Sequence, residues 1–269
     1  MANNIMNIMF VSFNSQAELE DFLNRVKGKD DDGEKDFSLQ SVVPMPESLQ
    51  IVSPCDRMLA WAAVNKYGID PEKYPENVRK AICRETFLLH RKEKLTASDM
   101  VGVCKEAAEA RSKLEHVKDS KLINLKRIPY NIEEFDAVAE RTLENAVSYG
   151  YASWYYWRVA NWGVKWDVFD VSIRRTNDTE ITVNFKTPWN TPTCAIVELS
   201  RKFPHANIRV EYADEDIGSN CGWYALCKGD FVDDGYPSEG NAAIDFACKL
   251  EGSAEGDNAA SMVKKLFAR

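Results

Sequence analysis

Aromatic residues are concentrated in one short stretch of this 269-residue chain. Four of the seven tryptophans lie within thirteen residues, and two tyrosines lie between them. The four are Trp154, Trp157, Trp162 and Trp166. Indole rings bury a large apolar area, so we expect a helix here that packs its rings against a neighbouring element. One helix face cannot hide six rings, and at least one is therefore expected to reach the surface or line a groove.

The first fifty residues predict strand, helix, strand. An apolar run at 5–13 is typical of a buried strand, and Ser15 with Glu18 forms a capping box that predicts a helix ending at Gly28. A charged loop at 29–36 should lead to a second strand at 37–43.

The next hundred residues carry repeated helix-start signals and few β-branched runs. They predict helices at 58–64, 78–90 and 101–117. A fourth helix should start at Asn131 and line one face with apolar residues. Since an internal glycine costs a helix only about 1 kcal/mol, we expect this helix to continue through Gly150 to Asn161 and to end at Gly163.

After residue 168 the hydrophobic period changes to two, which is typical of half-buried strands. The strands are expected at 169–174, 181–186, 208–212 and 222–228, with a helix at 192–203. The tail from residue 239 predicts two further helices, at 242–249 and 259–267.

Composition limits the possible functions. The net charge of -8 argues against a general binder of the nucleic-acid backbone, whose affinity comes mainly from Lys and Arg. No secretion signal and no membrane-spanning apolar run occurs, so we expect a cytoplasmic protein that does not bind membranes. The seven cysteines are scattered and are expected to be reduced and mostly buried, without disulfides.

Motifs for common chemistry do not occur in the sequence. Neither GxxxxGK[ST] nor GxGxxG is present, and three histidines with scattered cysteines form no metal-binding spacing. We therefore expect no catalytic residue, no metal site and no cofactor. Acidic clusters at 30–32, 214–216 and 230–234 are expected in loops as solubilising groups. The clusters also leave open a metal site or imitation of a row of phosphates.

Several motifs together suggest a family. The run Asn161-Trp162-Gly163-Val164-Lys165-Trp166-Asp167, the block at 185–192, Phe203-Pro204 and the segment at 43–49 resemble a phage and plasmid protein family of unassigned biochemistry. Its carboxy-terminal part is a YubB-type ferredoxin-like domain, and the resemblance covers residues 5–50 and 130–235. It implies an origin on a mobile genetic element and a ferredoxin-like sheet, and it implies no catalytic residue.

The predicted fold class is therefore α+β: a ferredoxin-like antiparallel sheet with helices on one face and a helical insertion. Residues 1–50 and 128–238 should form the ferredoxin-like body. Residues 51–127 should form the insertion, and residues 239–269 a helical C-terminal tail.

The expected working surface lies at the ends of the predicted elements around the tryptophan cluster. Its candidate binding residues are Arg158, Trp162, Lys165, Trp166, Trp189 and Asn190. The leading hypothesis is a non-enzymatic phage or plasmid accessory protein that binds a host protein, such as a defence or nucleic-acid-processing factor. One alternative is a nucleic-acid or nucleotide binder that stacks bases on the indoles. Another is a metal-dependent enzyme of unrecognised type that uses the acidic loops.

Overall fold

A computed structural model describes residues 3–30, 33–51, 57–86, 89, 92–115, 132–237 and 240–254. The chain forms two compact units: Met1–Pro44 with Arg158–Arg269, and Met45–Trp157. We call them the sheet unit and the helical unit. The division falls after residue 157, whereas the sequence predicted it after residue 127, because helix α7 (Ile132–Tyr149) packs on helix α3 (Met58–Tyr67).

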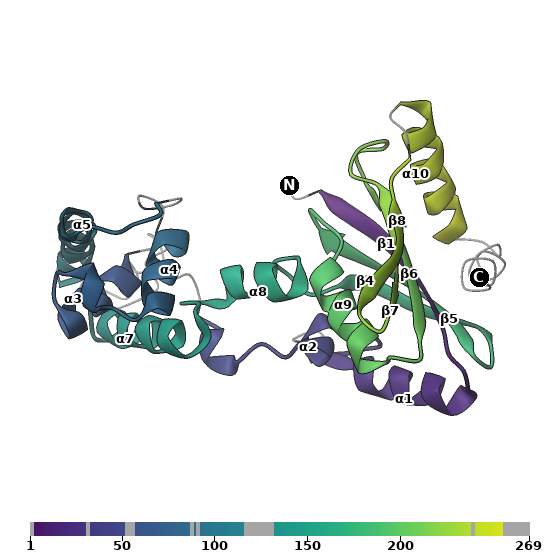
Figure 1. Ribbon diagram of the computed structural model, residues 1–269, viewed down its shortest axis with the longest axis horizontal. Helices are drawn as coiled ribbons and strands as arrows, with labels where there is room; N and C mark the ends of the chain where they lie inside the picture. The colour runs from purple at the N-terminus through teal and green to yellow at the C-terminus, as the bar shows by residue number, and fades with distance from the viewer. Residues whose placement is uncertain are drawn as a thin grey trace. The chain divides into compact units, whose positions relative to one another are not determined.

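Six strands of the described chain form one antiparallel sheet in the order β4-β5-β1-β6-β7-β8 (Figure 1). The strands are β1 (Asn4–Ser12), β4 (Phe169–Asn177), β5 (Glu180–Pro188), β6 (Asn207–Asp214), β7 (Gly222–Cys227) and β8 (Asp230–Gly235). Helix α1 (Gln16–Val26) follows β1, and helix α9 (Thr193–Lys202) follows β5. The chain order β1-α1-β4-β5-α9-β6 with the spatial order β4-β5-β1-β6 is the ferredoxin-like arrangement, so the predicted fold class is confirmed.

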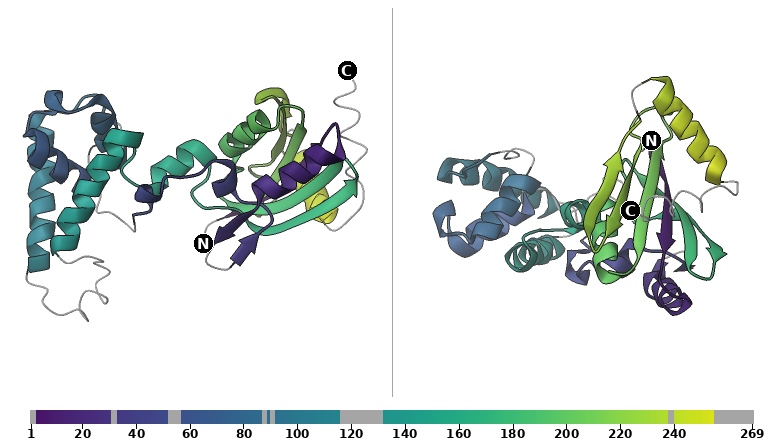
Figure 2. Two further views of the ribbon diagram at one scale, coloured as in Figure 1. Left: turned by 90° about the horizontal axis from the view of Figure 1, so that it is seen from below. Right: turned by 45° about the vertical axis from the view of Figure 1, so that its right-hand side comes forward.

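The two faces of the sheet follow from the alternation of side chains along β1. Met9 lies opposite Val183 on β5 and Val210 on β6, and all three are completely buried on one face. Met6, Ile8 and Phe10 point to the other face, where Ile8 and Phe10 pack with Ala247 and Leu250 of helix α10 (Asn241–Ala254). Figure 2 shows this helix in yellow beside the sheet. The predicted helix at 242–249 is thus part of the sheet unit and covers the second face, while 259–267 lies outside the described residues.

The segment at 37–43, predicted as a strand, is instead a short helix, α2 (Leu39–Val42). Ser38 caps it by accepting the N–H of Gln40, and the Asp167 carboxylate accepts the N–H of Leu39 at 2.7 Å. These polar partners replace the hydrogen bonds that a strand would need, while Phe37 and Leu39 remain completely buried. The predicted loop before it contains a small hairpin of β2 (Gly28–Asp30) and β3 (Gly33–Lys35).

The prediction of one long helix through Gly150 is also wrong. Helix α7 ends at Tyr149, and a separate helix α8 spans Trp154–Trp162. Gly150 has φ 76°, and its N–H bonds to the carbonyl of Ala146, which is the usual role of glycine after a helix. Gly163 ends α8 in the same way, as predicted, with φ 87° and a hydrogen bond to Val159.

The acidic cluster at 230–234 lies on strand β8, where a loop was expected. Three aspartates lower the strand propensity of this segment, which hid the strand from sequence analysis. One of them, Asp233, pairs with the almost buried guanidinium of Arg209 on β6 at 3.3 Å. Asp214, also expected in a loop, is the last residue of β6 and is buried.

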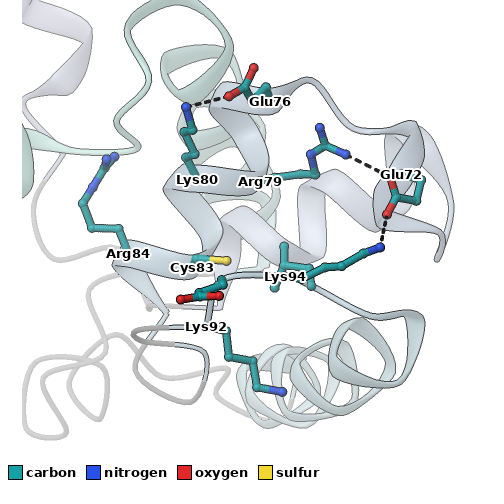
Figure 3. A pocket seen from close by; sticks show the side chains of 10 residues that line it. Glu72, Glu76, Arg79, Lys80, Cys83, Arg84, Lys92 and Lys94 are labelled. Atoms are coloured by element: carbon teal, nitrogen blue, oxygen red, sulfur yellow. Dashed lines mark hydrogen bonds and ion pairs between the residues drawn. The ribbon is translucent and has the colours of Figure 1, made fainter.

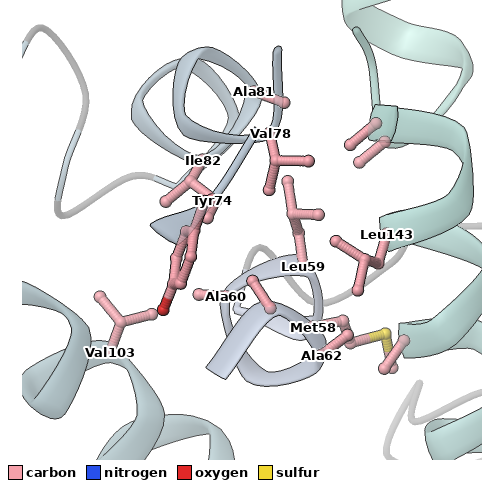
Figure 4. Packing of buried hydrophobic residues seen from close by; sticks show 14 of the residues in the cluster. Met58, Leu59, Ala60, Ala62, Tyr74, Val78, Ala81, Ile82, Val103 and Leu143 are labelled. Carbon is pink, nitrogen blue, oxygen red and sulfur yellow. The ribbon is translucent and has the colours of Figure 1, made fainter. Parts of the chain in front are cut away.

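The helical unit consists of η1 (Glu47–Leu49), α3, η2 (Pro71–Lys73), α4 (Glu76–Glu85), α5 (Ala97–Glu115) and α7 in the part that the structure describes. Helix α5 begins at Ala97, four residues before the predicted start at residue 101, because Thr96 and Asp99 cap one another reciprocally. Leu59, Val78 and Leu143 meet in its core, and small alanines let the helices approach closely (Figure 4). No helix among the described residues is long and apolar enough to cross a bilayer.

Candidate functional site

Two of the predicted binding residues lie inside the sheet unit. Trp162 is 1% exposed, and its indole N–H donates to the carbonyl of Val43 at 2.9 Å. The guanidinium of Arg158 stands 4.7 Å over the Trp162 ring, and burial lowers the pKa of Arg158. The expectation that Trp162 faces a ligand is therefore corrected, since its ring and its polar atom are both occupied within the fold.

Three other predicted residues come together at the surface. The ammonium of Lys165 lies 3.9 Å from the ring centroid of Trp166 and 3.4 Å from that of Trp189. The two tryptophans are 47% and 52% exposed, which is unusual for such large apolar side chains. We call Lys165, Trp166 and Trp189 the tryptophan–lysine surface. Asn190, the fourth predicted residue, is exposed directly beside it.

The segment that carries Lys165 and Trp166 is anchored on both sides. Val164 and Val168 are buried, so the exposed residues between them are held by apolar packing. The Asp167 carboxylate accepts the hydroxyl of Ser38 at 2.6 Å and the N–H of Val168 at 2.8 Å. These contacts fix the backbone at the point where the side chains of Lys165 and Trp166 leave it.

The backbone of Trp189 adopts an unusual conformation. Its φ is 67°, in the left-handed region that costs an L-residue roughly 1–2 kcal/mol. Its N–H donates to the carbonyl of Asn3 at 2.8 Å, and its carbonyl accepts the side-chain N–H of Asn220 at 3.2 Å. Strain at an exposed aromatic residue, maintained by hydrogen bonds from two other segments, is typical of functional positions.

A buried series of hydrogen bonds also holds the loop that carries Trp189 and Asn190. The side chain of Asn7, completely buried on β1, donates to Thr187 Oγ1 at 2.8 Å. The Thr187 hydroxyl in turn donates to the carbonyl of Asn190 at 2.7 Å. Asn190 also caps its own turn, because its side-chain oxygen accepts the N–H of Thr191. Buried polar groups in such a chain specify one loop geometry.

The surroundings of Trp189 are acidic. Asn3 and Asn220, which hold the Trp189 backbone, each also direct a side-chain N–H toward the Asp214 carboxylate, at 3.2 and 3.5 Å. Glu215 follows Asp214 and accepts from Asn4. Carboxylates near Trp189 disfavour a phosphate backbone and favour a partner with neutral or basic groups.

Sequence analysis missed the asparagines that position this surface. Asn3 and Asn7 lie more than 180 residues before Trp189, and Asn220 lies 31 residues after it in the loop between β6 and β7, so no local motif connects them. The described part of the chain contains no group of three or more His, Cys, Asp or Glu residues that could hold a metal. The described cysteines are all free, and Cys194 and Cys248 are exposed rather than buried.

Comparison with known proteins agrees with the fold. Residues 168–261 match the family described as the ferredoxin-like domain in Api92-like protein. Strand β1, from the N-terminal part of the chain, lies between β5 and β6 of this domain and completes its sheet. The uncharacterized protein YubB of Escherichia coli (strain K12) is 36% identical over 87 residues. The match covers 31% of this chain and 58% of YubB.

A solved structure is also similar. The crystal structure of a protein Api92 from Yersinia pseudotuberculosis aligns with 89% of this chain and 99% of its own, at 13% identity and a TM-score of 0.42.

Proposed function

We propose that the protein is a non-enzymatic accessory protein of a phage or plasmid, and that it binds a host protein in the bacterial cytoplasm through the tryptophan–lysine surface. The host protein would be a defence or nucleic-acid-processing factor that is inhibited by this binding. The observation that carries the proposal is the pair of half-exposed indoles held on either side of Lys165. The origin on a mobile element is supported by the sequence motifs around Trp162.

Several features of the surface suit a protein partner. Tryptophan is among the residues most enriched at energetic hot spots of protein interfaces, because its rigid ring buries a large area at low entropic cost. Trp166 and Trp189 are held by anchored backbone, so little order has to be gained on binding. The Lys165 ammonium already occupies a face of each ring, which leaves their edges and outer faces for contact.

The test is quantitative affinity capture from host lysate with three baits. They are the wild type, a Trp166→Ala/Trp189→Gly double variant, and a Tyr236→Ala control, which removes an aromatic ring that is 81% exposed elsewhere in the sheet unit. We expect one host protein to be recovered with the wild type and the control and to be reduced at least about tenfold with the double variant, as for loss of a hot spot. Equal recovery with all three baits would contradict the proposal.

A nucleic-acid or nucleotide binder is the second candidate, because two exposed indoles beside a lysine also suit base stacking. Fluorescence titration separates the two. Quenching of tryptophan emission by a single-stranded oligonucleotide, lost in the double variant and weakened by salt, would favour base stacking. The acidic groups around Asp214 lead us to expect no quenching at low salt.

A further inference from the structure

A pocket of about 660 Å³ opens on the helical unit, beside helix α4 and the segment before α5 (Figure 3). Five cationic side chains line it, against three carboxylates. They are Arg79, Lys80, Arg84, Lys92 and Lys94. Three of these cations already pair with other carboxylates: Lys80 with Glu76, Arg84 with Glu85 and Lys92 with Asp99. The other two, Arg79 and Lys94, share a single carboxylate.

The shared carboxylate is that of Glu72. Glu72 accepts from Arg79 through Oε2 and faces the Lys94 ammonium through Oε1, each at 3.3 Å (Figure 3). Its side chain is 61% exposed. An exposed ion pair contributes about 0–1 kcal/mol, so these two cations can exchange Glu72 for a stronger anion at little cost. A phosphate has the charge and the several acceptor oxygens to engage both.

Two uncharged residues, Cys83 and Leu95, also line the pocket. Cys83 lies one turn after Arg79 on α4, and burial raises the pKa of its thiol, which keeps the thiol neutral near pH 7. Leu95 is almost completely buried and gives the pocket an apolar wall. Cations beside an apolar wall suit a ligand that has an anionic end and a less polar body.

We propose that this pocket binds a small molecule with a phosphate or pyrophosphate group, and that Arg79 and Lys94 contact that group in the place of Glu72. The volume lies within the range of roughly 300–1,000 Å³ that small-molecule pockets occupy. The ligand is a free small molecule rather than a nucleic acid, because the acidic chain as a whole repels a long polyanion. The inference is independent of the tryptophan–lysine surface.

The test is isothermal titration calorimetry of the full chain with pyrophosphate and with ADP at low ionic strength. An Arg79→Ala/Lys94→Ala double variant should bind at least about tenfold more weakly, since it loses two charged hydrogen bonds. Glu72→Gln should bind roughly three- to tenfold more tightly, because it removes the competing carboxylate. Glu20→Gln, which makes the same charge change at an ion pair of the sheet unit with Arg175, should bind like the wild type.

The sign of the Glu72→Gln effect is the discriminating result. A merely structural Glu72 would give unchanged or weaker binding, and either outcome overturns the proposal. The absence of binding heat at millimolar pyrophosphate and ADP also overturns the proposal. Equal affinity of the wild type and the Arg79/Lys94 double variant, with unchanged circular dichroism, overturns it too. Tighter binding of a single-stranded oligonucleotide than of pyrophosphate, dependent on Lys94, would overturn the choice of a small ligand.

Discussion

Substitution of Trp162 tests whether the tryptophan cluster is chiefly structural. Trp162→Phe keeps an aromatic ring but removes the N–H that donates to Val43 at 2.9 Å, at a site that is 1% exposed. Loss of this part-buried hydrogen bond costs about 0.5–1.5 kcal/mol, and the smaller ring leaves a cavity that adds to this. We therefore expect a loss of about 2–4 kcal/mol, and about 3–5 kcal/mol for Trp162→Ala.

The matched control is Trp166→Phe, because Trp166 is 47% exposed and its ring contact with Lys165 contributes only about 0.5–1 kcal/mol. For a unit of this size, 1 kcal/mol shifts the unfolding midpoint by about 2–4 °C. Thermal unfolding followed by circular dichroism should thus show a fall of about 4–16 °C for Trp162→Phe and less than about 4 °C for the control. Equal midpoints for the two variants would refute the structural role assigned to Trp162.

Three further predictions concern the loop of Trp189 and a buried carboxyl. Thr187→Val should lower the free energy of unfolding by about 1–3 kcal/mol in urea titration, because the Asn190 carbonyl loses its donor; an unchanged midpoint would contradict this. Trp189→Gly should be more stable than Trp189→Ala by about 1 kcal/mol, since only glycine adopts φ 67° without strain. Burial raises the pKa of Glu85 above 4.5, so the folded chain holds the proton more tightly than the unfolded chain. The wild type should therefore gain stability relative to Glu85→Gln as the pH falls from 7 toward 4.5, and a constant difference in melting temperature between the two would count against this.

Much of the fold could be predicted because its signals are local. The capping box of Ser15 and Glu18, the alternation along β5 and the glycine after α8 each act within a few residues. Errors arose where a distant group changed the outcome. Asp167 supplies the hydrogen bonds that make α2 a helix, and Arg209 pairs with an aspartate of β8, where the sequence alone indicated a loop.

The candidate surface shows the same limit. Lys165, Trp166, Trp189 and Asn190 were predicted because each lies at the end of an element, where side chains reach solvent. The meeting of Trp166 with Trp189 depends on the register of β4 with β5 and of β5 with β1, which brings residue 188 opposite Asn4. A shift by one residue would turn every side chain of the strand to the other face.

The sequence by itself determined the fold class, the ferredoxin-like sheet and the type of residue that could serve a binding surface. Only the tertiary structure decided which tryptophans serve it: Trp162 is enclosed with its N–H on Val43, while Trp166 and Trp189 remain half-exposed around Lys165. The physical reason is that periodicity and capping act between near neighbours along the chain, whereas burial of a ring depends on residues that only the folded sheet brings together.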